Sequence, residues 1–280
     1  DHALLVPEFH RFGPGHFHFK NRGIAADDAK LQSGYFWARI CEEIEDFDGA
    51  VLLSSEYLYN MGAPGLGRLD RALHQLGFDL TVVCYVRHPV SLAISSAQQN
   101  IKRGTSTIAE MTERPRWHSV VDALEPPLQV VGRERIIVRS HVDALEQGAE
   151  RDLLRTIGYR GPLAAIPRRL ANPALSLEAV LLIDTYHAMV REKCVPANMV
   201  ASLLGVEGRR FSLPRRAVEC ILEQAEPEMH WLEQQFGIRL AVPDSSPQEM
   251  DMPSPTELRE RILSHLGLTM QKGRNDARPS

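Results

Sequence analysis

The sequence is poor in cysteine and has no long apolar run. Its four cysteines are widely spaced and form no CxxC pair: Cys41, Cys84, Cys194 and Cys220. Such spacing favours free thiols in a reducing compartment over a disulfide framework. No stretch approaches the roughly 18 apolar residues that a membrane-spanning helix needs, and no signal peptide opens the sequence. We therefore expect a cytoplasmic protein without a membrane span.

Positive charge is not in excess either. The 32 Lys and Arg residues face 36 Asp and Glu residues, which gives a net charge of -4. The molecule as a whole should not attract nucleic acid or anionic lipid, so neither is expected as a partner. An anionic ligand must be met by Arg, Lys and backbone N–H groups placed locally. A hydrophobic content of 44% allows a sizeable core.

Strands and helices alternate over the first part of the chain. The run LTVVCYVR at 80–87 is apolar and rich in Val, as is typical of a strand covered on both faces. Shorter strands are predicted at 50–53 and 136–140. Helical periodicity predicts helices at 27–47, around Leu69 to Leu76, and at 89–104, 117–131 and 148–157. This alternation predicts a parallel sheet with helices on both faces.

The pattern changes beyond Pro173, where no strong strand is predicted. Helices are expected at 176–193, 197–204, 214–236 and 255–266. We expect an α/β nucleotide-binding core over 1–170, N-terminally incomplete, and a helical extension over 171–268 packed on it. The tail at 269–280 should be disordered. Residues 1–24 are interpreted as loop.

The turn after the strongest strand has the residues of an anion site. Arg87 stands at the carboxyl end of this strand, where ligands bind in open α/β sheets. Pro89 opens the next helix, and Ser91 and Ser95 are one helical turn apart. A phosphate here would meet a guanidinium, hydroxyls and the positive end of the helix dipole. A surface ion pair of Arg87, with solvated serines, is the alternative.

The stretch VVCYVRHPVSLAISS resembles the 3′-phosphate-binding motif of sulfotransferases that use PAPS (3′-phosphoadenosine 5′-phosphosulfate). In that family an Arg closes a strand, a Pro commonly follows two residues later, and a Ser follows eight residues after the Arg. Arg87, Pro89 and Ser95 have these intervals. VLLSSEYL resembles the preceding strand and turn, and ANPALSLEAV resembles an Asn-x-x-x-Ser segment that leads into a helix. The resemblance covers roughly residues 5–193.

This resemblance implies a three-layer parallel sheet of the P-loop/sulfotransferase type with a helical C-terminal extension. It implies transfer of a sulfuryl group from PAPS, without a metal, to a hydroxyl of a small-molecule or glycan acceptor. Arg87 and Ser95, with Ser91, would hold the 3′-phosphate. Glu56 follows a buried strand, where related enzymes place a Glu or His base, and would deprotonate the acceptor. A turn cap or an ion pair is the alternative role for Glu56.

One element of the family is missing from the sequence. The family carries a Lys-x-Gly-Thr/Ser-rich loop near its N-terminus that cradles the 5′-phosphosulfate. This sequence has no such loop and no GxxxxGK[ST], and we interpret GAPGLGR at 62–68 as an ordinary loop. Either the sequence is a fragment that lacks the upstream loop, or the protein has none. Without the loop the chain should be a poor catalyst.

Two alternative functions are compatible with the predicted α/β architecture. The first is a catalytically inactive protein of the same fold that binds a nucleotide or a glycan. A P-loop kinase is less favoured, because it needs the Walker loop. We expect no metal site: His10, His16 and His18 are close in sequence, but only Glu8 adjoins them as a further ligand.

Overall fold

A computed structural model of the chain describes residues 3–6, 38, 40–42, 44, 45, 47, 49–54, 58–166, 174–190, 203–243, 260 and 264. The chain divides into two compact units. Unit 1 is Asp1–Val86 with Val120–Pro167, and unit 2 is Arg87–Ser119 with Arg168–Ser280. Residues 87–119 therefore group with the C-terminal part of the chain, whereas the sequence predicts one core over 1–170.

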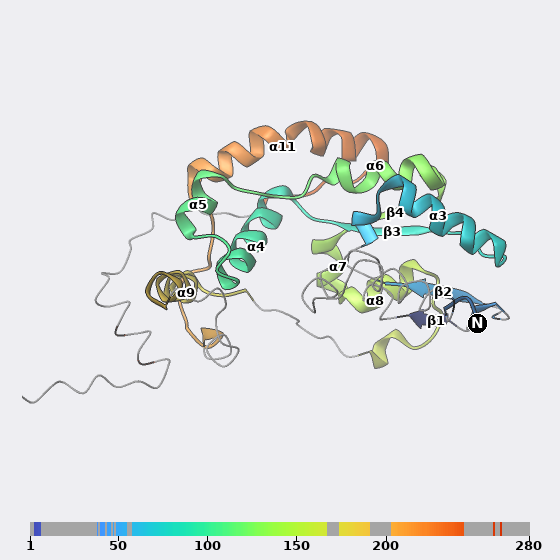
Figure 1. The fold of residues 1–280 in the computed structure, drawn as a ribbon, viewed down its shortest axis with the longest axis horizontal. Helices are drawn as coiled ribbons and strands as arrows, with labels where there is room; N and C mark the ends of the chain where they lie inside the picture. Colours follow the sequence, from blue (N-terminus) through green and yellow to red (C-terminus); the bar gives the residue numbers. More distant parts are fainter. Residues whose placement is uncertain are drawn as a thin grey trace, which may run out of the picture. The chain divides into compact units, whose positions relative to one another are not determined.

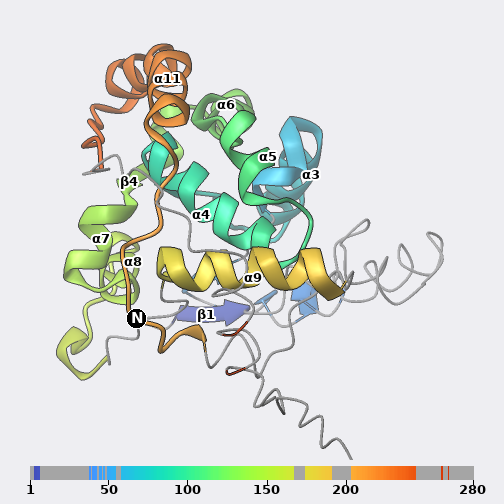
Figure 2. The ribbon, with the colours of Figure 1, turned by 90° about the vertical axis from the view of Figure 1, so that its left-hand side faces the viewer.

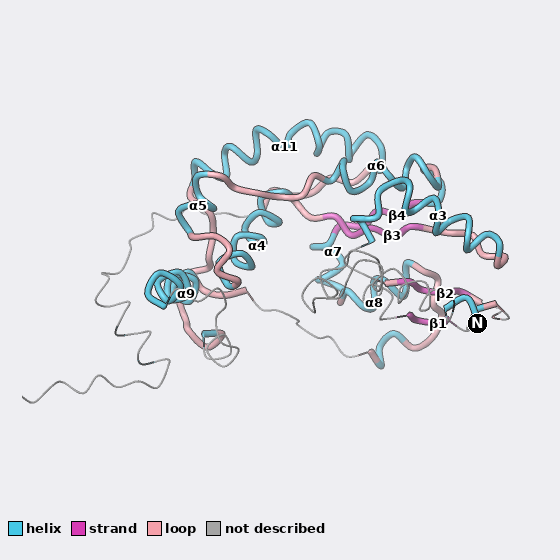
Figure 3. Tube along the Cα trace, viewed as in Figure 1, coloured by secondary structure: helices cyan, strands magenta, loops and turns pink. Residues whose placement is uncertain are grey.

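Unit 1 contains two pairs of parallel strands (Figures 1 and 3). In one pair β1, Ala3–Val6, lies beside β2, Ala50–Leu53. In the other β3, Val82–Val86, lies beside β4, Ile136–Ser140, with Val86 opposite Ser140. The predicted strands at 50–53 and 136–140 are confirmed, as is a mixed α/β fold with parallel strands. The loop prediction is wrong for residues 3–6, where the apolar ALLV pairs with β2.

The Gly-rich stretch at 62–68 is helical, so its prediction as a loop is wrong. A short 3-10 helix, η2 at Leu58–Met61, leads directly into α3, Gly62–Gln75. Each glycine weakens a helix by about 1 kcal/mol relative to alanine. Leu69 and Leu73 offset this, because they are buried in one cluster with Ile40 and Ile44. Tertiary packing has therefore overridden local propensity.

The remaining helices of unit 1 cover the strand pair β3–β4. They are α6 at Val120–Val131, α7 at His141–Gln147 and α8 at Ala149–Thr156. Helix α6 packs on α3 and also contacts both strands. Helix α7 was not predicted from the sequence, although the Ser140 hydroxyl caps it by accepting from the Asp143 N–H at 3.4 Å. Two further 3-10 turns are η3, Arg133–Arg135, and η4, Leu163–Ala165.

A buried carboxylate joins β3, β4 and α8. Asp152 is 0% exposed and accepts two hydrogen bonds from the Arg139 guanidinium, at 2.5 Å and 3.2 Å. The Tyr85 hydroxyl donates to the same carboxylate at 2.8 Å. The hydrogen bond from Arg139 is the main cause that holds the pKa of Asp152 below its usual value. The charge is therefore paired as a buried charge must be.

Unit 2 is helical apart from one isolated β-bridge in its described residues. Its helices are α4 at Pro89–Lys102, α5 at Ile108–Glu113, α9 at Leu177–Val190 and α11 at Arg215–Phe236. Helix α4 packs on both α9 and α11, and Figure 2 shows α4 above α9. The predicted helices at 89–104, 176–193 and 214–236 are confirmed. Those at 197–204 and 255–266 lie mostly outside the described residues.

The core of unit 2 is formed by buried residues from both of its sequence segments, 87–119 and 168–280. Val90, Ala93 and Ala97 of α4 are completely buried, as is Leu182 of α9. Asp184 of α9 accepts the Ile108 N–H at the start of α5, at 3.3 Å, and so fastens that short helix to the core. None of the described helices is both long and apolar enough to cross a bilayer.

Candidate functional site

Arg87 is half-buried, and none of the described residues supplies a counter-charge to it. It follows β3 in the chain and stands two residues before α4. Its Nε atom is buried and has no hydrogen-bond partner in the part of the chain that the structure describes. Burial lowers the pKa of the guanidinium, and the positive charge of Arg210 lowers it further. No described carboxylate pairs with Arg87, so the surface ion pair that the sequence left open is not observed.

The first turn of α4 is already capped by its own chain. The His88 side chain is 4% exposed, and its Nδ1 accepts the Val90 N–H at 3.2 Å. Burial lowers the pKa of His88, which favours the neutral ring with its proton on Nε2. Pro89 has no N–H, so among the residues that follow His88 in this turn only Ser91 keeps a backbone N–H for an anion. Side chains must therefore do most of the binding.

The two serines predicted with Arg87 lie on successive turns of α4. Ser91 is half-buried in the first turn and Ser95 is exposed in the second. Their spacing of four residues places them on one face of the helix. Arg87 thus precedes α4, and Ser91 and Ser95 lie in its first half; their common contact with a phosphate stays a prediction. Glu56, the predicted base, lies outside the described residues.

A buried glutamine fixes the segment that precedes α9 against α4. The Gln98 side chain donates to the Leu175 carbonyl at 3.4 Å and accepts the Leu175 N–H at 3.3 Å. Ser176 then caps α9, because its hydroxyl accepts the Ala179 N–H at 3.1 Å. The segment that resembles the Asn-x-x-x-Ser motif thus does lead into a helix, although its Asn172 lies outside the described residues.

An extended segment returns beside this helix start. The Leu177 N–H donates to the Arg209 carbonyl at 2.7 Å, and Ser176 forms an antiparallel bridge with Arg210. Glu178 in the first turn of α9 accepts the Arg209 N–H at 2.9 Å and also lies 3.5 Å from the Arg209 Nε. The charge of Arg209 is therefore matched by that of Glu178.

Residues 210–213 alternate between the core and the opposite side of the segment. Phe211 and Leu213 are buried in the core of unit 2. Arg210 is exposed. Ser212 is half-buried, and its Oγ atom has no hydrogen-bond partner within the described ranges. In an extended chain, alternate side chains share one side. Arg210 and Ser212 were missed by the sequence analysis, although the alternation of RRFSL is a readable signal for this arrangement.

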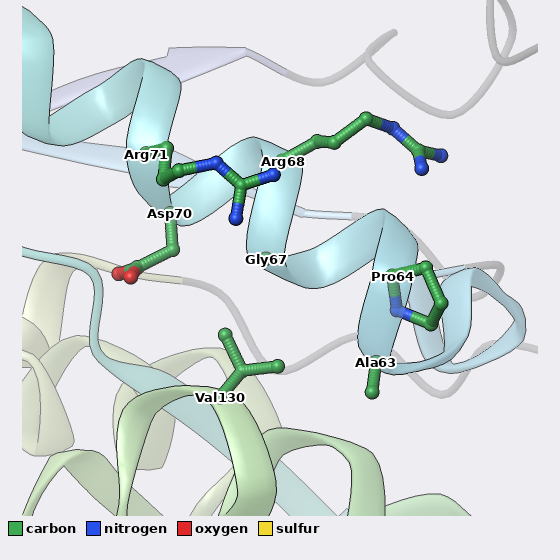
Figure 4. A pocket seen from close by; sticks show the side chains of 7 residues that line it. All are labelled: Ala63, Pro64, Gly67, Arg68, Asp70, Arg71 and Val130. Atoms are coloured by element: carbon green, nitrogen blue, oxygen red, sulfur yellow. The ribbon is translucent and has the colours of Figure 1, made fainter.

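The described part of unit 1 contains two cavities, and neither is lined by Arg87 or by the serines of α4. The smaller, of about 440 Å³, lies between α3 and α6, and Figure 4 shows Arg68, Asp70 and Arg71 around it. Asp70 is engaged by Arg135 at 3.2 Å. The larger, of about 1100 Å³, is mainly apolar and is lined by β2, β3 and α3. Within the described ranges no group of His, Cys, Asp or Glu is placed to hold a metal ion, and His10, His16 and His18 lie outside them.

The comparisons with known proteins add no relative. No protein-family model, no curated protein and no solved structure matches this chain. The functional argument therefore rests on the residues of the site.

Proposed function

We propose that this protein is a sulfotransferase-like protein that binds the 3′-phosphate of PAPS at Arg87. The single observation that carries the proposal is the buried Arg87 Nε without a hydrogen-bond partner, in a guanidinium that no described carboxylate neutralises. A buried polar group without a partner is unfavourable, and an arginine fork matches two oxygens of a phosphate. A phosphate at this position would satisfy the atom and supply the missing negative charge.

The serines of α4 complete the proposed binding site. Ser91 and Ser95 would each donate a hydroxyl hydrogen bond to the phosphate, and Ser91 would add its backbone N–H. Support for this role is their common face at the end of α4 that Arg87 precedes. Because His88 already holds the Val90 N–H, the site relies on charged and hydroxyl side chains rather than on a ring of backbone amides.

The proposed reaction moves the sulfuryl group to an acceptor hydroxyl. Glu56 would take the hydroxyl proton while the acceptor oxygen forms the new bond to sulfur. The bond between sulfur and the phosphate oxygen of PAPS breaks, and 3′,5′-adenosine bisphosphate leaves. A second candidate is a catalytically inactive protein of the same fold that binds a nucleotide or a glycan without transfer.

The proposal includes the fold, a single parallel sheet of the sulfotransferase type with helices on both faces. Among the described strands, β2 pairs only with β1, and β3 pairs only with β4. Residues of β2 and β3 line the same mainly apolar cavity of about 1100 Å³. Exposed strand edges beside apolar side chains are normally covered or paired. This supports the inclusion of both strand pairs in one sheet.

Calorimetric titration tests the proposed function directly. 3′,5′-Adenosine bisphosphate should bind the wild-type protein, and adenosine 5′-monophosphate, which lacks the 3′-phosphate, should bind at least tenfold more weakly. Arg87→Ala should weaken the bisphosphate by at least tenfold, about 1.4 kcal/mol. Arg116→Ala removes an exposed arginine of the same unit and serves as the matched control. Equal affinities for the wild type and Arg87→Ala would reject the site.

A further inference from the structure

We propose that the cavity between α3 and α6 binds a small organic phosphate, with Arg68 and Arg71 as the residues that hold the phosphate group. The site is separate from the proposed 3′-phosphate site, since every residue that lines it belongs to unit 1. Its volume of about 440 Å³ lies within the range of about 300–1,000 Å³ that is usual for small-molecule sites. The inference does not depend on the proposed function.

Gly67 is the glycine of α3 that packing within the fold does not explain. A glycine inside a helix is destabilising, so it needs a structural or functional reason. Gly62 starts α3 with a φ of +60°, and a Cβ at Gly65 would lie only 3.0 Å from the Cβ of Met61. A Cβ at Gly67 would meet its nearest neighbour at an ordinary 3.6 Å. Gly67 instead lines the cavity, where the missing side chain lets a ligand approach the helix backbone.

Two arginines of α3 supply unmatched positive charge at this cavity. Arg68 and Arg71 both line it, and their spacing of three residues makes them neighbours on the helix surface. Neither forms a hydrogen bond or an ion pair with any residue that the structure describes. One terminal nitrogen of Arg71 would lie 3.6 Å from a Cβ at Gly67, so this guanidinium borders the open face of the helix. Planar guanidinium groups bind phosphate oxygens in pairs, so the two arginines can hold one phosphate.

Among the described residues that line the cavity, the one carboxylate, that of Asp70, is already paired. Its Oδ1 atom accepts a hydrogen bond from the Arg135 guanidinium at 3.2 Å. Arg135 is itself held in place, because its Nε donates to the Val131 carbonyl at 3.0 Å. The charges of Asp70 and Arg135 therefore offset each other, and those of Arg68 and Arg71 remain. A phosphate monoester carries about 1.5 to 2 negative charges at pH 7, which matches this excess better than the single charge of a carboxylate.

Apolar side chains of both helices form the rest of the cavity. Figure 4 shows Ala63 and Pro64 at the start of α3, and Val130 of α6, around it. Val130 faces Gly67, since both of its methyl carbons would be 4.0 Å from a Cβ at that position. An organic group attached to the phosphate can pack against these side chains, which inorganic phosphate cannot do. The cavity therefore favours an organic phosphate over the free ion.

Calorimetric titration at low ionic strength tests the site with phenyl phosphate, inorganic phosphate and benzoate as probes. The titrations use the Arg87→Ala protein as well as the wild type, so that the proposed 3′-phosphate site cannot account for the binding. We expect both proteins to bind phenyl phosphate equally, and about threefold or more tighter than either other probe. Arg68→Ala and Arg71→Ala should each weaken phenyl phosphate about fivefold or more. Asp70→Asn, which leaves Arg135 as a third unmatched cation, should tighten it.

Gly67→Leu tests the cavity without removing a charge. Leucine is a good helix former and its first side-chain atom has room at this position, so thermal unfolding should occur at or above the wild-type temperature. The larger side chain should nevertheless fill the cavity and weaken phenyl phosphate about tenfold. Arg160→Ala removes an exposed arginine of unit 1 outside the cavity and serves as the matched control, with an unchanged affinity expected.

The possible failures of this inference and of the proposed function are distinguishable. Wild-type affinity in Arg68→Ala, Arg71→Ala and Gly67→Leu, or no binding by the folded wild type, would refute the site on α3 and leave the proposed function untouched. If Arg87→Ala alone abolishes binding of phenyl phosphate, the ligand occupies the proposed 3′-phosphate site and the inference fails. Equal affinities for phenyl phosphate and benzoate would refute the assignment of the ligand as a phosphate.

Discussion

The contact between Gln98 and Leu175 permits a quantitative prediction for the framework of the site. Gln98→Met keeps a side chain of similar length but removes both the donor and the acceptor. Leu175 is 2% exposed, so its N–H and C=O would be left buried without a partner. Each such group costs about 1–3 kcal/mol. The two bonds are long, at 3.3 Å and 3.4 Å, so we take the lower figure and expect a loss of about 2 kcal/mol in the free energy of unfolding.

Urea denaturation followed by circular dichroism measures this loss as a lower midpoint with an unchanged slope. The matched control is Gln99→Met, because Gln99 is the exposed neighbour on the same helix. That variant should stay within about 0.5 kcal/mol of the wild type. Equal midpoints for the two variants would refute the idea that Gln98 holds this segment in place.

Three other perturbations have expected outcomes that follow from the described contacts. Arg139→Ala leaves the buried carboxylate of Asp152 without its cation, and should lower the free energy of unfolding by about 3–5 kcal/mol in urea titrations. Burial lowers the pKa of His88 below its unfolded value of 6.5, so its contribution to stability is present above about pH 7 and is lost as the pH falls through the folded pKa. His88→Asn, whose oxygen can cap the same N–H, should flatten this part of the pH profile of the unfolding midpoint. Gly67→Ala should stabilise α3 by about 0.5–1 kcal/mol in thermal unfolding, because the new methyl group would meet its nearest neighbour at an ordinary 3.6 Å.

The elements that the sequence predicted well share a strong local pattern. Strand β3 is a continuous apolar run bounded by polar residues, and α4 has a proline at its first position and a cation in its last turn. Helices α9 and α11 are long enough for their apolar positions to establish a period. These patterns lie within the strand or helix itself, so no knowledge of its contacts with the rest of the chain is needed to predict it.

The elements that were missed depend on contacts between distant residues or on short signals. The glycines at the start of α3 favour a loop until Leu69 and Leu73 meet the cluster around Ile40. Helix α5 has only six residues, too few for a period to show. Its capping box was readable, because Thr107 and Glu110 have the required spacing and each side chain bonds the other's backbone N–H. This capping box predicts that a helix starts after Thr107.

The candidate site divides in the same way between local and distant information. Arg87, Ser91 and Ser95 lie in one short stretch, so a spacing argument can find them. The position of Arg210 beside Ser176, at the start of α9, cannot be found from spacing, because it depends on a bridge between residues far apart in the sequence. Its neighbour Arg209 has the same residue type but is matched by a carboxylate. Composition alone cannot distinguish the two.

The start of α4 limits how the proposed anion site can bind its ligand. A helix terminus binds anions through backbone N–H groups, which carry only partial charge. Here His88 takes the Val90 N–H and Pro89 has none, so the terminus retains little of that capacity. In the proposed site the guanidinium of Arg87 would have to supply the positive charge that these N–H groups do not. A loss of binding in Arg87→Ala should therefore be larger than the loss caused by removing either serine hydroxyl of α4.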